Sequence, residues 1–339
     1  MINAINIIQI ILLIIFIMLR IALITLIERK LLGTSQARKG PNIVNLSGIL
    51  QPIADAIKLL TKEIILPNNT NPVLFILTPI IALTLALFTW TIIPLNKNYS
   101  IRDLNIGIVF IFAIRSLRVY SVLLTGWSRN SKYAFIGAIR ATAQMIRYEI
   151  AIGLIILTTI AIINSFNLNK ILELQEKIWL LIPLFPVFTM FMISRLAETN
   201  RTPFDLTEGE SELVAGFNVE YTSINFTLLF LAEYTNISLI RAIIIIIFLG
   251  GSVIFTTRTS SIFAIKIRLI IYIFIWTRTT LPRMRYDQLM YLIWKRLLPL
   301  RLRLIVITPV ILLITPISQG WKNTSILNIE KCRLKSYLW

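Results

Sequence analysis

Residues 2–27 read INAINIIQIILLIIFIMLRIALITLI, and this apolar run decides the class of fold. A run of about 20 apolar residues matches the hydrocarbon core of a bilayer, which is roughly 30 Å thick. Inside that core every backbone polar group needs a partner within the protein, which leaves α-helices or a closed β-barrel. Long unbroken apolar runs favour helices over the short alternating segments of a barrel. With 56% apolar residues over 339 positions, the sequence predicts an all-α polytopic membrane protein.

The first run does not resemble a secretory signal peptide. It is longer than the apolar region of such a peptide, no basic segment precedes it, and no small-residue cleavage site follows it. We therefore interpret it as the first membrane span and expect no removable targeting peptide. Residues 1–316 are expected to form one membrane domain, and the tail at 317–339 is assigned no role.

Further apolar runs bring the expected number of spans to about eight. They are predicted at residues 4–27, 72–94, 104–125, 134–163, 177–196, 221–249, 260–280 and 288–315. An even number of spans places both termini on one side of the membrane. The loops after odd-numbered spans carry Arg29, Lys30, Arg38, Lys39, Lys58, Lys62, Arg283 and Arg285. The positive-inside rule assigns these loops to the cytoplasm-equivalent side, which is the matrix in a mitochondrion. The asymmetry is weakened by Lys97, Arg102, Lys170 and Lys177 on the opposite side.

Residues 46–65 (LSGILQPIADAIKLLTKEII) are too short and too charged to cross a bilayer. Ile53, Ile57 and Leu60 recur at helical spacing, while Asp55 and Lys58 fall on another face. We predict an amphipathic helix that lies in the membrane interface. A plain linker helix fits the same pattern equally well.

The composition constrains cofactor chemistry. The chain has no histidine and one cysteine, Cys332. Haem, iron–sulfur and most zinc sites draw on these residues in numbers that the chain lacks. No glycine-rich phosphate loop is present. We therefore expect no metal and no bound cofactor here, with any redox centre held by partner subunits. Nucleic-acid binding is not expected despite the net charge of +18, because the basic residues are spread through loops that flank the spans.

The segment at 196–221, LAETNRTPFDLTEGESELVAGFNVEY, is acidic although it adjoins an apolar span. It holds six of the sixteen carboxylates, namely Glu198, Asp205, Glu208, Glu210, Glu212 and Glu220. A solvated surface run is one interpretation, and an oxygen-ligand metal site at EGESE is a weaker one. Apolar residues such as Phe204 and Phe217 interleave with the acids, which favours a docking and gating loop at 197–220. Closely spaced carboxylates raise one another's pKa and can hold or release protons near neutral pH.

Carboxylates in or beside the spans are the second functional signal. Glu149 and Glu233 lie within predicted spans, whereas Glu198 and Glu220 bracket the acidic loop. Such groups usually face the interior of a helix bundle and serve proton or ion paths. A buried ion pair explains any one of them equally well. Taken together with Glu208, Glu210 and Glu212, they indicate a proton or coupling path.

Several motifs occur in order along the chain. They are IERKLLG, RKGPN, QPIADAIKLLTKE, NSKYAFIGAIRATAQ, YEI, LAETNRTPFDLTEGESELVAGFNVEY and LPRMRYDQLMYLIWK. From about residue 20 to residue 300 the chain resembles the chain 1 family of mitochondrial NADH–ubiquinone oxidoreductase, respiratory complex I. The resemblance implies eight helices in the mitochondrial inner membrane, at the meeting of the membrane arm and the peripheral arm.

The resemblance also implies roles for particular positions. Those matching Arg29, Asp55, Phe204, Asp205, Arg278 and Arg283 are implied to line or flank a ubiquinone chamber. Those matching Glu149, Glu198 and Glu233, with the acids of the loop, are implied to begin a route towards proton-pumping subunits. NADH, FMN and the iron–sulfur clusters are implied to bind to partner subunits, and membrane lipids to surround the chain.

Two other classes of function stay open. One is a quinone-independent, ion-translocating or anchoring subunit of a related hydrogenase-like complex. The other is a stand-alone transporter, although the two halves of the chain show no inverted repeat.

A group of arginines conflicts with the predicted spans. They are Arg115, Arg118, Arg129, Arg147, Arg241, Arg296, Arg301 and Arg303. An arginine in the middle of a span costs about 2.5–3.5 kcal/mol on insertion scales. One hypothesis is that some of these positions are serine, since certain organelle codes read two arginine codons as serine. The competing interpretation is that the arginines pair with acids of adjacent subunits.

Overall fold

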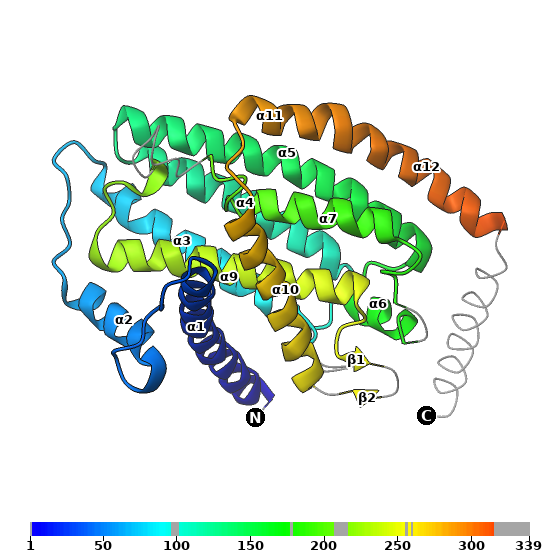
Figure 1. Ribbon diagram of the computed structural model, residues 1–339, viewed down its shortest axis with the longest axis horizontal. Coiled ribbons are helices and arrows are strands. Elements are labelled where there is room, and N and C mark those ends of the chain that lie inside the picture. The colour runs from blue at the N-terminus through cyan, green and yellow to red at the C-terminus, as the bar shows by residue number, and fades with distance from the viewer. Residues whose placement is uncertain are drawn as a thin grey trace.

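The computed structural model describes residues 2–95, 102–176, 179–206, 216–254, 257–258 and 260–314. Helices dominate these residues, and a two-stranded antiparallel ribbon joins two of them (Figure 1). The long helices are α1 (Ile2–Ser35), α3 (Pro72–Trp90), α4 (Gly107–Trp127), α5 (Lys132–Ile163), α9 (Ser223–Phe248) and α10 (Ser260–Thr280). The shorter elements are η1 (Leu46–Gly48), α2 (Gln51–Thr61), α6 (Leu168–Leu174), α7 (Phe185–Glu198), η2 (Gly216–Asn218), β1 (Val253–Ile254), β2 (Thr257–Arg258), α11 (Tyr286–Tyr291), η3 (Leu292–Leu297) and α12 (Leu298–Ile314).

Six of the described helices are long and apolar enough to cross a membrane. They are α3, α4, α5, α9, α10 and the part of α1 from Ile8 to Ser35. The predicted all-α polytopic membrane fold is confirmed by these helices. The first helix continues past the predicted end at residue 27, because no proline interrupts the chain before Pro41.

The predicted spans at 177–196 and 288–315 do not each form one long helix. The run at 177–196 contains α7, which has 14 residues and begins with proline in its first turn. The run at 288–315 falls on α11, the π-helical η3 and α12, which follow one another without a break. The number of eight spans therefore stays a prediction.

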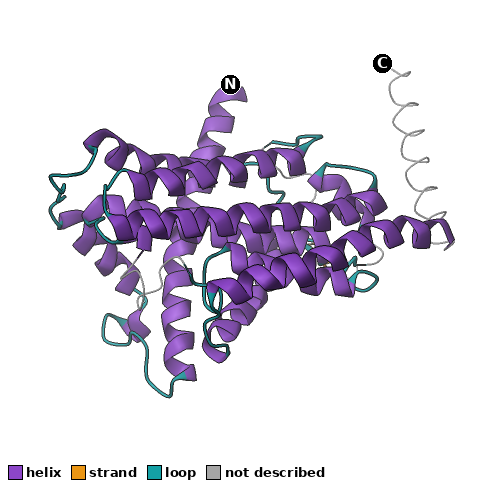
Figure 2. Cartoon of the chain, turned by 90° about the horizontal axis from the view of Figure 1, so that it is seen from above, coloured by secondary structure: helices purple, strands orange, loops and turns teal. Residues whose placement is uncertain are grey.

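Helix α9 lies at the centre of the bundle and contacts α1, α2, α3, α6, α7 and α10. Every residue from Thr235 to Phe248 is buried. A helix that is apolar on all sides needs such surroundings, which explains the place of the isoleucine-rich run at 243–247. Figure 1 shows α3, α4, α5 and α9 running side by side, with α1 and α10 at a steep angle to them, and Figure 2 shows the N-terminal part of α1 projecting from the bundle.

The predicted amphipathic helix is present as α2, although it is shorter than the segment 46–65. Pro52 stands in its first turn, and none of its residues is buried. Ile53, Ile57 and Leu60 are each more than half exposed. This apolar face fits the membrane interface, and that placement stays a prediction.

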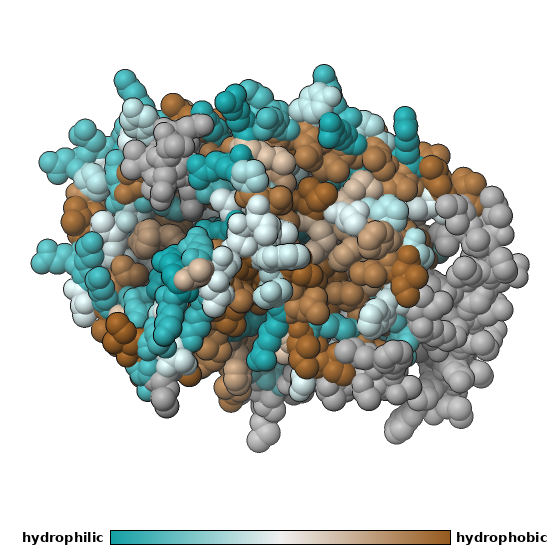
Figure 3. Space-filling model, in the orientation of Figure 1, coloured by the Kyte–Doolittle hydropathy of each residue, from teal (hydrophilic) through white to brown (hydrophobic). Residues whose placement is uncertain are grey.

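Large apolar side chains cover much of the outer surface of the bundle (Figure 3). On α1, for example, Phe16 is 68% exposed and Ile8 is 56% exposed. Water-soluble monomers rarely expose broad apolar patches, so the surface agrees with a protein surrounded by lipid or by membrane partners.

Candidate functional site

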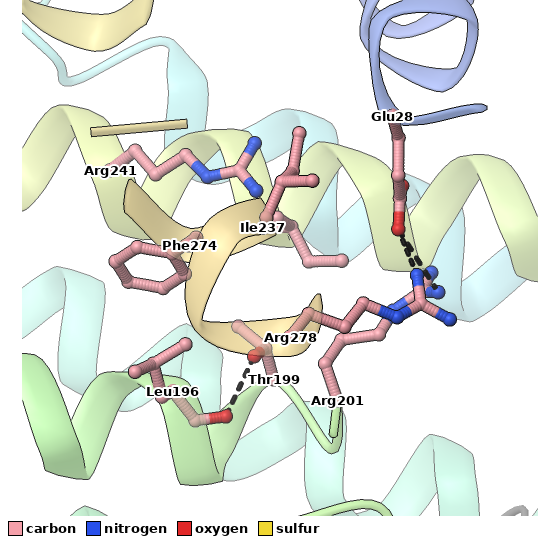
Figure 4. Close-up of a pocket in the computed structure, with 9 residues that line it drawn as sticks. Glu28, Leu196, Thr199, Arg201, Ile237, Arg241, Phe274 and Arg278 are labelled. Atoms are coloured by element: carbon pink, nitrogen blue, oxygen red, sulfur yellow. Dashed lines mark hydrogen bonds and ion pairs between the residues drawn. The ribbon is translucent and has the colours of Figure 1, made fainter. Parts of the chain in front are cut away.

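A group of charged side chains lies where α1, α9 and α10 meet the chain that follows α7. We call Glu28, Arg201, Glu233, Tyr234 and Arg278 the Glu28 network. Glu28 is near the C-terminal end of α1 and forms an ion pair with Arg278 of α10 (Figure 4). The hydroxyl of Tyr234 donates a hydrogen bond to Glu28 Oε2 at 2.9 Å. Three separate helices are therefore joined at one carboxylate.

Arg201 connects the two acids of this network. Its Nε lies 3.3 Å from Glu233 Oε1, and its Nη1 lies 3.9 Å from Glu28 Oε1. Its guanidinium carbon is also 4.9 Å from the centre of the Tyr234 ring. One cation therefore links a carboxylate of α1 to a carboxylate of α9.

A small pocket adjoins the network on its inner side. Charged and apolar side chains line the pocket together with one threonine. The lining residues are Glu28, Leu196, Thr199, Arg201, Ile237, Arg241, Phe274, Ile275 and Arg278. Figure 4 shows Glu28 pointing towards Arg201 and Arg278 at one end, with Phe274 at the other. The network is thus next to a space with an apolar wall.

A second group of charges surrounds Glu198, the last residue of α7. Arg195 Nη1 donates to Glu198 Oε2 at 3.0 Å, and Arg115 of α4 forms an ion pair with Oε1. All three side chains are almost fully buried. We call these residues the Glu198 cluster. Two buried guanidinium groups therefore share one carboxylate, so the cluster has more positive than negative side chains.

Glu149 of α5 is half-buried and lies within electrostatic range of Arg115. Arg147, in the same helix, donates to the sulfur of Met290 in α11. The structure thus brings the predicted path residues Glu149 and Glu198 together through Arg115.

Four of the six candidates for the quinone chamber form two separate ion pairs, while Arg278 belongs to the Glu28 network. Arg29 Nη1 lies 2.6 Å from Asp55 Oδ2, and Gln51 donates to the other oxygen of Asp55 at 2.9 Å. Arg283 Nη2 lies 3.3 Å from Asp205 Oδ2. These pairs fix α2 to α1 and the loop after α7 to the chain before α11.

Backbone contacts hold the start of the acidic loop in place. The N–H of Met284 donates to the carbonyl of Pro203 at 3.0 Å. Gln144 of α5 donates to the carbonyl oxygens of Ala197 and Phe204. Phe204 is buried, as the apolar pattern of the loop predicts.

The end of the loop packs against α3 through Tyr221. The rings of Tyr221 and Phe75 are stacked with centroids 4.2 Å apart. The Tyr221 hydroxyl is 3.2 Å from Thr78 Oγ1, and Glu220 beside it is half-buried. The Arg129 guanidinium lies over the ring at 4.0 Å. Burial lowers the pKa of Arg129 to about 10, an effect that Tyr221 and Glu220 oppose.

Other predicted site residues lie outside the described residues. Glu208, Glu210 and Glu212 belong to this set, as does the tail at 317–339. Within the described ranges, no three Asp, Glu, Cys or His side chains form a group that could hold a metal ion.

Sequence reasoning missed three members of the Glu28 network, namely Glu28, Arg201 and Tyr234. Glu28 directly follows the apolar run of α1, which is the same signal that singled out Glu149 and Glu233. Arg201 and Tyr234 had no signal of their own, because their role depends on the contacts between distant segments.

Known proteins resemble this chain along most of its length. The sequence profile of the NADH dehydrogenase family matches residues 8–309. The chain belongs to the NADH dehydrogenase family. It is 52% identical over 294 residues to NADH-ubiquinone oxidoreductase chain 1 of Metridium senile, covering 86% of this chain and 88% of the relative. The chain of the same name from Salmo salar is 53% identical over 290 residues, with 85% and 89% coverage.

Bacterial members of the family are similar as well. One subunit of the NADH-quinone oxidoreductase of Paramagnetospirillum magneticum is 46% identical over 301 residues, which cover 87% of this chain and 88% of the relative. The resemblance expected from the motifs is therefore confirmed along most of the chain.

Proposed function

We propose that this chain is the membrane subunit of a proton-pumping NADH:ubiquinone oxidoreductase that houses the quinone and couples its reduction to proton translocation. The names of the relatives support the complex, since each is named as one part of an NADH–quinone oxidoreductase. The observation that carries the coupling role is the Glu28 network, because two acids share one arginine beside a pocket.

The chemistry of quinone explains why such a network is useful. A quinone that accepts two electrons also takes up two protons to become a quinol. The electrons come from a redox centre in a partner subunit, whereas the protons come from acids or water near the quinone head group. Negative charge that develops on the quinone attracts protons and arginine side chains. Acids that are balanced by a shared arginine can respond to that change.

The outer ion pairs are suited to hold a quinone head group. Asp205–Arg283 places a hydrogen-bond donor and acceptor directly after the apolar Phe204, and Arg29–Asp55 provides a second such pair between α1 and α2. Arg278 is a further hydrogen-bond donor, and its ion pair with Glu28 connects the proposed head-group site to the Glu28 network. In this proposal the loop at 197–220 docks against the peripheral arm, and its movement signals the redox state of the quinone.

From these acids the path continues through the buried charges. Glu233 belongs to the central helix α9, while Arg115 pairs with Glu198 and lies within electrostatic range of Glu149. The proposed location is the mitochondrial inner membrane, with the basic loops in the matrix. Other membrane-arm subunits and lipid cover the apolar surface.

Photoaffinity labelling of the intact, active complex tests the quinone site. A quinone analogue with a photoreactive head group is expected to label residues close to Asp55 or Phe204, and excess ubiquinone is expected to prevent the labelling. The exposed apolar residue Val73 at the start of α3 serves as a lipid-facing control. Labelling that is absent in an active complex, or that excess ubiquinone does not reduce, contradicts the quinone role and favours an anchoring subunit.

A further inference from the structure

Three buried arginines form no ion pair with an acid of the described residues. Arg129 is 2% exposed, Arg241 is 5% exposed and Arg301 is 1% exposed. All three guanidinium nitrogens of Arg301, and Nε and Nη1 of Arg241, make no hydrogen bond within the described part of the chain, while the neighbour of the Arg129 guanidinium is the aromatic Tyr221. We refer to them as the unpaired arginines.

Buried arginine normally has a carboxylate partner. A guanidinium presents five N–H donors and keeps its positive charge at neutral pH. Burying a charge without a partner is strongly unfavourable, so buried charges are paired almost everywhere in proteins. Arg201, Arg278 and Arg283 follow this rule, because each forms an ion pair with an acid. The unpaired arginines break it.

Aromatic side chains lie close to all three unpaired arginines. The guanidinium of Arg129 lies over Tyr221, and that of Arg241 lies over Phe274 at 5.4 Å. Arg301 is close to Tyr148, whose buried hydroxyl also makes no hydrogen bond within the described residues. A ring face can attract a cation, but it leaves the N–H groups without acceptors.

Adjacent subunits cannot supply the missing acceptors. The three side chains are buried by this chain itself. A partner that binds to the outside of the bundle therefore does not reach them. The interpretation that these arginines pair with acids of neighbouring subunits is excluded for these three positions.

We propose that the native polypeptide has serine at positions 129, 241 and 301, because the organelle that translates the gene reads the codons AGA or AGG as serine. Serine fits each position without an acid. In helices its hydroxyl donates to a backbone carbonyl one turn earlier, which satisfies the group locally. Other serines of this chain do so: Ser194 donates to Phe191 at 2.8 Å, and Ser238 donates to Thr235 at 2.8 Å.

Positions 241 and 301 lie inside α9 and α12, where the same local hydrogen bond is within reach. Position 129 directly follows Ser128, whose own hydroxyl donates to Thr125 at 3.1 Å. A serine at each place removes a buried positive charge, and at positions 241 and 301 a carbonyl of the same helix is within reach as its acceptor.

Serine at position 241 also changes the pocket beside the Glu28 network. Arg241 is one of the residues that line this pocket. A smaller hydroxyl side chain gives room for water, which needs polar partners such as Glu28 and Thr199. A hydrated pocket is a better proton conductor than one that contains a guanidinium. This consequence rests on the proposed function, whereas the identity of the residue does not.

Tandem mass spectrometry of the complex purified from its own organism tests the proposal. Chymotryptic peptides are sequenced across positions 129, 241 and 301, and the codons are read from the organelle gene. Serine encoded by AGA or AGG is expected at the three positions. Arg201, Arg278 and Arg283 are the matched controls and are expected to be arginine. Arginine found at any of the three positions overturns the proposal there, and serine at the controls overturns its structural basis. Neither result depends on quinone binding or proton transport.

Discussion

The Glu28 network and the Glu198 cluster contain the same kinds of residue but differ in charge balance. The network has two acids and two arginines with a tyrosine, and the side chain of Arg278 is 29% exposed. The Glu198 cluster has one acid between two arginines, and the side chain of Arg195 is only 1% exposed. The network balances acids and arginines at a partly accessible place, whereas the cluster has an excess of buried positive charge that depends on one carboxylate, Glu198. The comparison teaches that the balance of charges, as well as burial, decides what the loss of one acid does to the fold.

The largest effect is expected from Glu198→Gln. The substitution leaves Arg115 and Arg195 buried without a carboxylate, and breaking a buried ion pair costs about 3–5 kcal/mol. We expect a severe loss of assembled complex, measured on native gels of the membrane fraction. Glu198→Asp keeps the charge and is the matched control. A normal amount of complex with Gln at this position would show that the cluster does not depend on the carboxylate.

Glu233→Gln is expected to affect activity instead of assembly. Arg201 keeps its contact with Glu28, so the fold retains a partner for the cation. Loss of a proton-transfer acid slows a reaction by about 100-fold or more. We expect slow quinone reduction and weak proton translocation in vesicles that contain a normal amount of complex. Unchanged rates would remove Glu233 from the path.

A smaller effect is expected from Tyr234→Phe. The change removes one hydrogen bond to Glu28, and a hydrogen bond to a charged group contributes about 1.5–3 kcal/mol. Because Arg278 still holds Glu28, we expect a decrease in quinone reduction of about tenfold, measured in steady-state assays. Phe at the exposed position Tyr272 is the control. Equal effects at the two positions would argue against a specific role for the Tyr234 hydroxyl.

The smallest effect on stability is expected from Asp55→Asn. The Arg29 side chain of this pair is 56% exposed, and ion pairs at such positions contribute about 0–1 kcal/mol. Assembly is expected to be unchanged, while the KM for quinone rises if the pair borders the chamber. The ratio of KM to kcat separates the two roles. A change in assembly without a change in KM would assign Asp55 to fixing α2 alone.

The sequence predicted the helical class and the positions of the long helices, because their apolar runs are unbroken. It was less informative for α7 and for the segment from α11 to α12, although their apolar composition is similar to that of the long helices. Helix α7 has a proline in its first turn, and a π-helical turn lies between α11 and α12. Ion pairs between distant segments, such as Glu28 with Arg278, depend on packing that no local pattern contains. The acids within the spans were still identifiable, since a charge in an apolar helix is rare.

The identity of the arginines is a related lesson. From the sequence, Arg115 and Arg241 are equally out of place in apolar helices. The structure separates them, because Arg115 forms an ion pair with Glu198, whereas Arg241 lies over the ring of Phe274 and forms no ion pair with an acid of the described residues. Burial and partners together decide which of these charges are compatible with the fold.

A map of the intact complex with quinone bound is the most direct test of the central claim, which is that the Glu28 network responds to quinone chemistry. We predict a continuous cavity that leads from the quinone head group to Arg278 and Glu28, with the acidic loop at its wall. A map in which the network faces open water, or in which side chains seal it from every space that quinone can reach, would contradict the account.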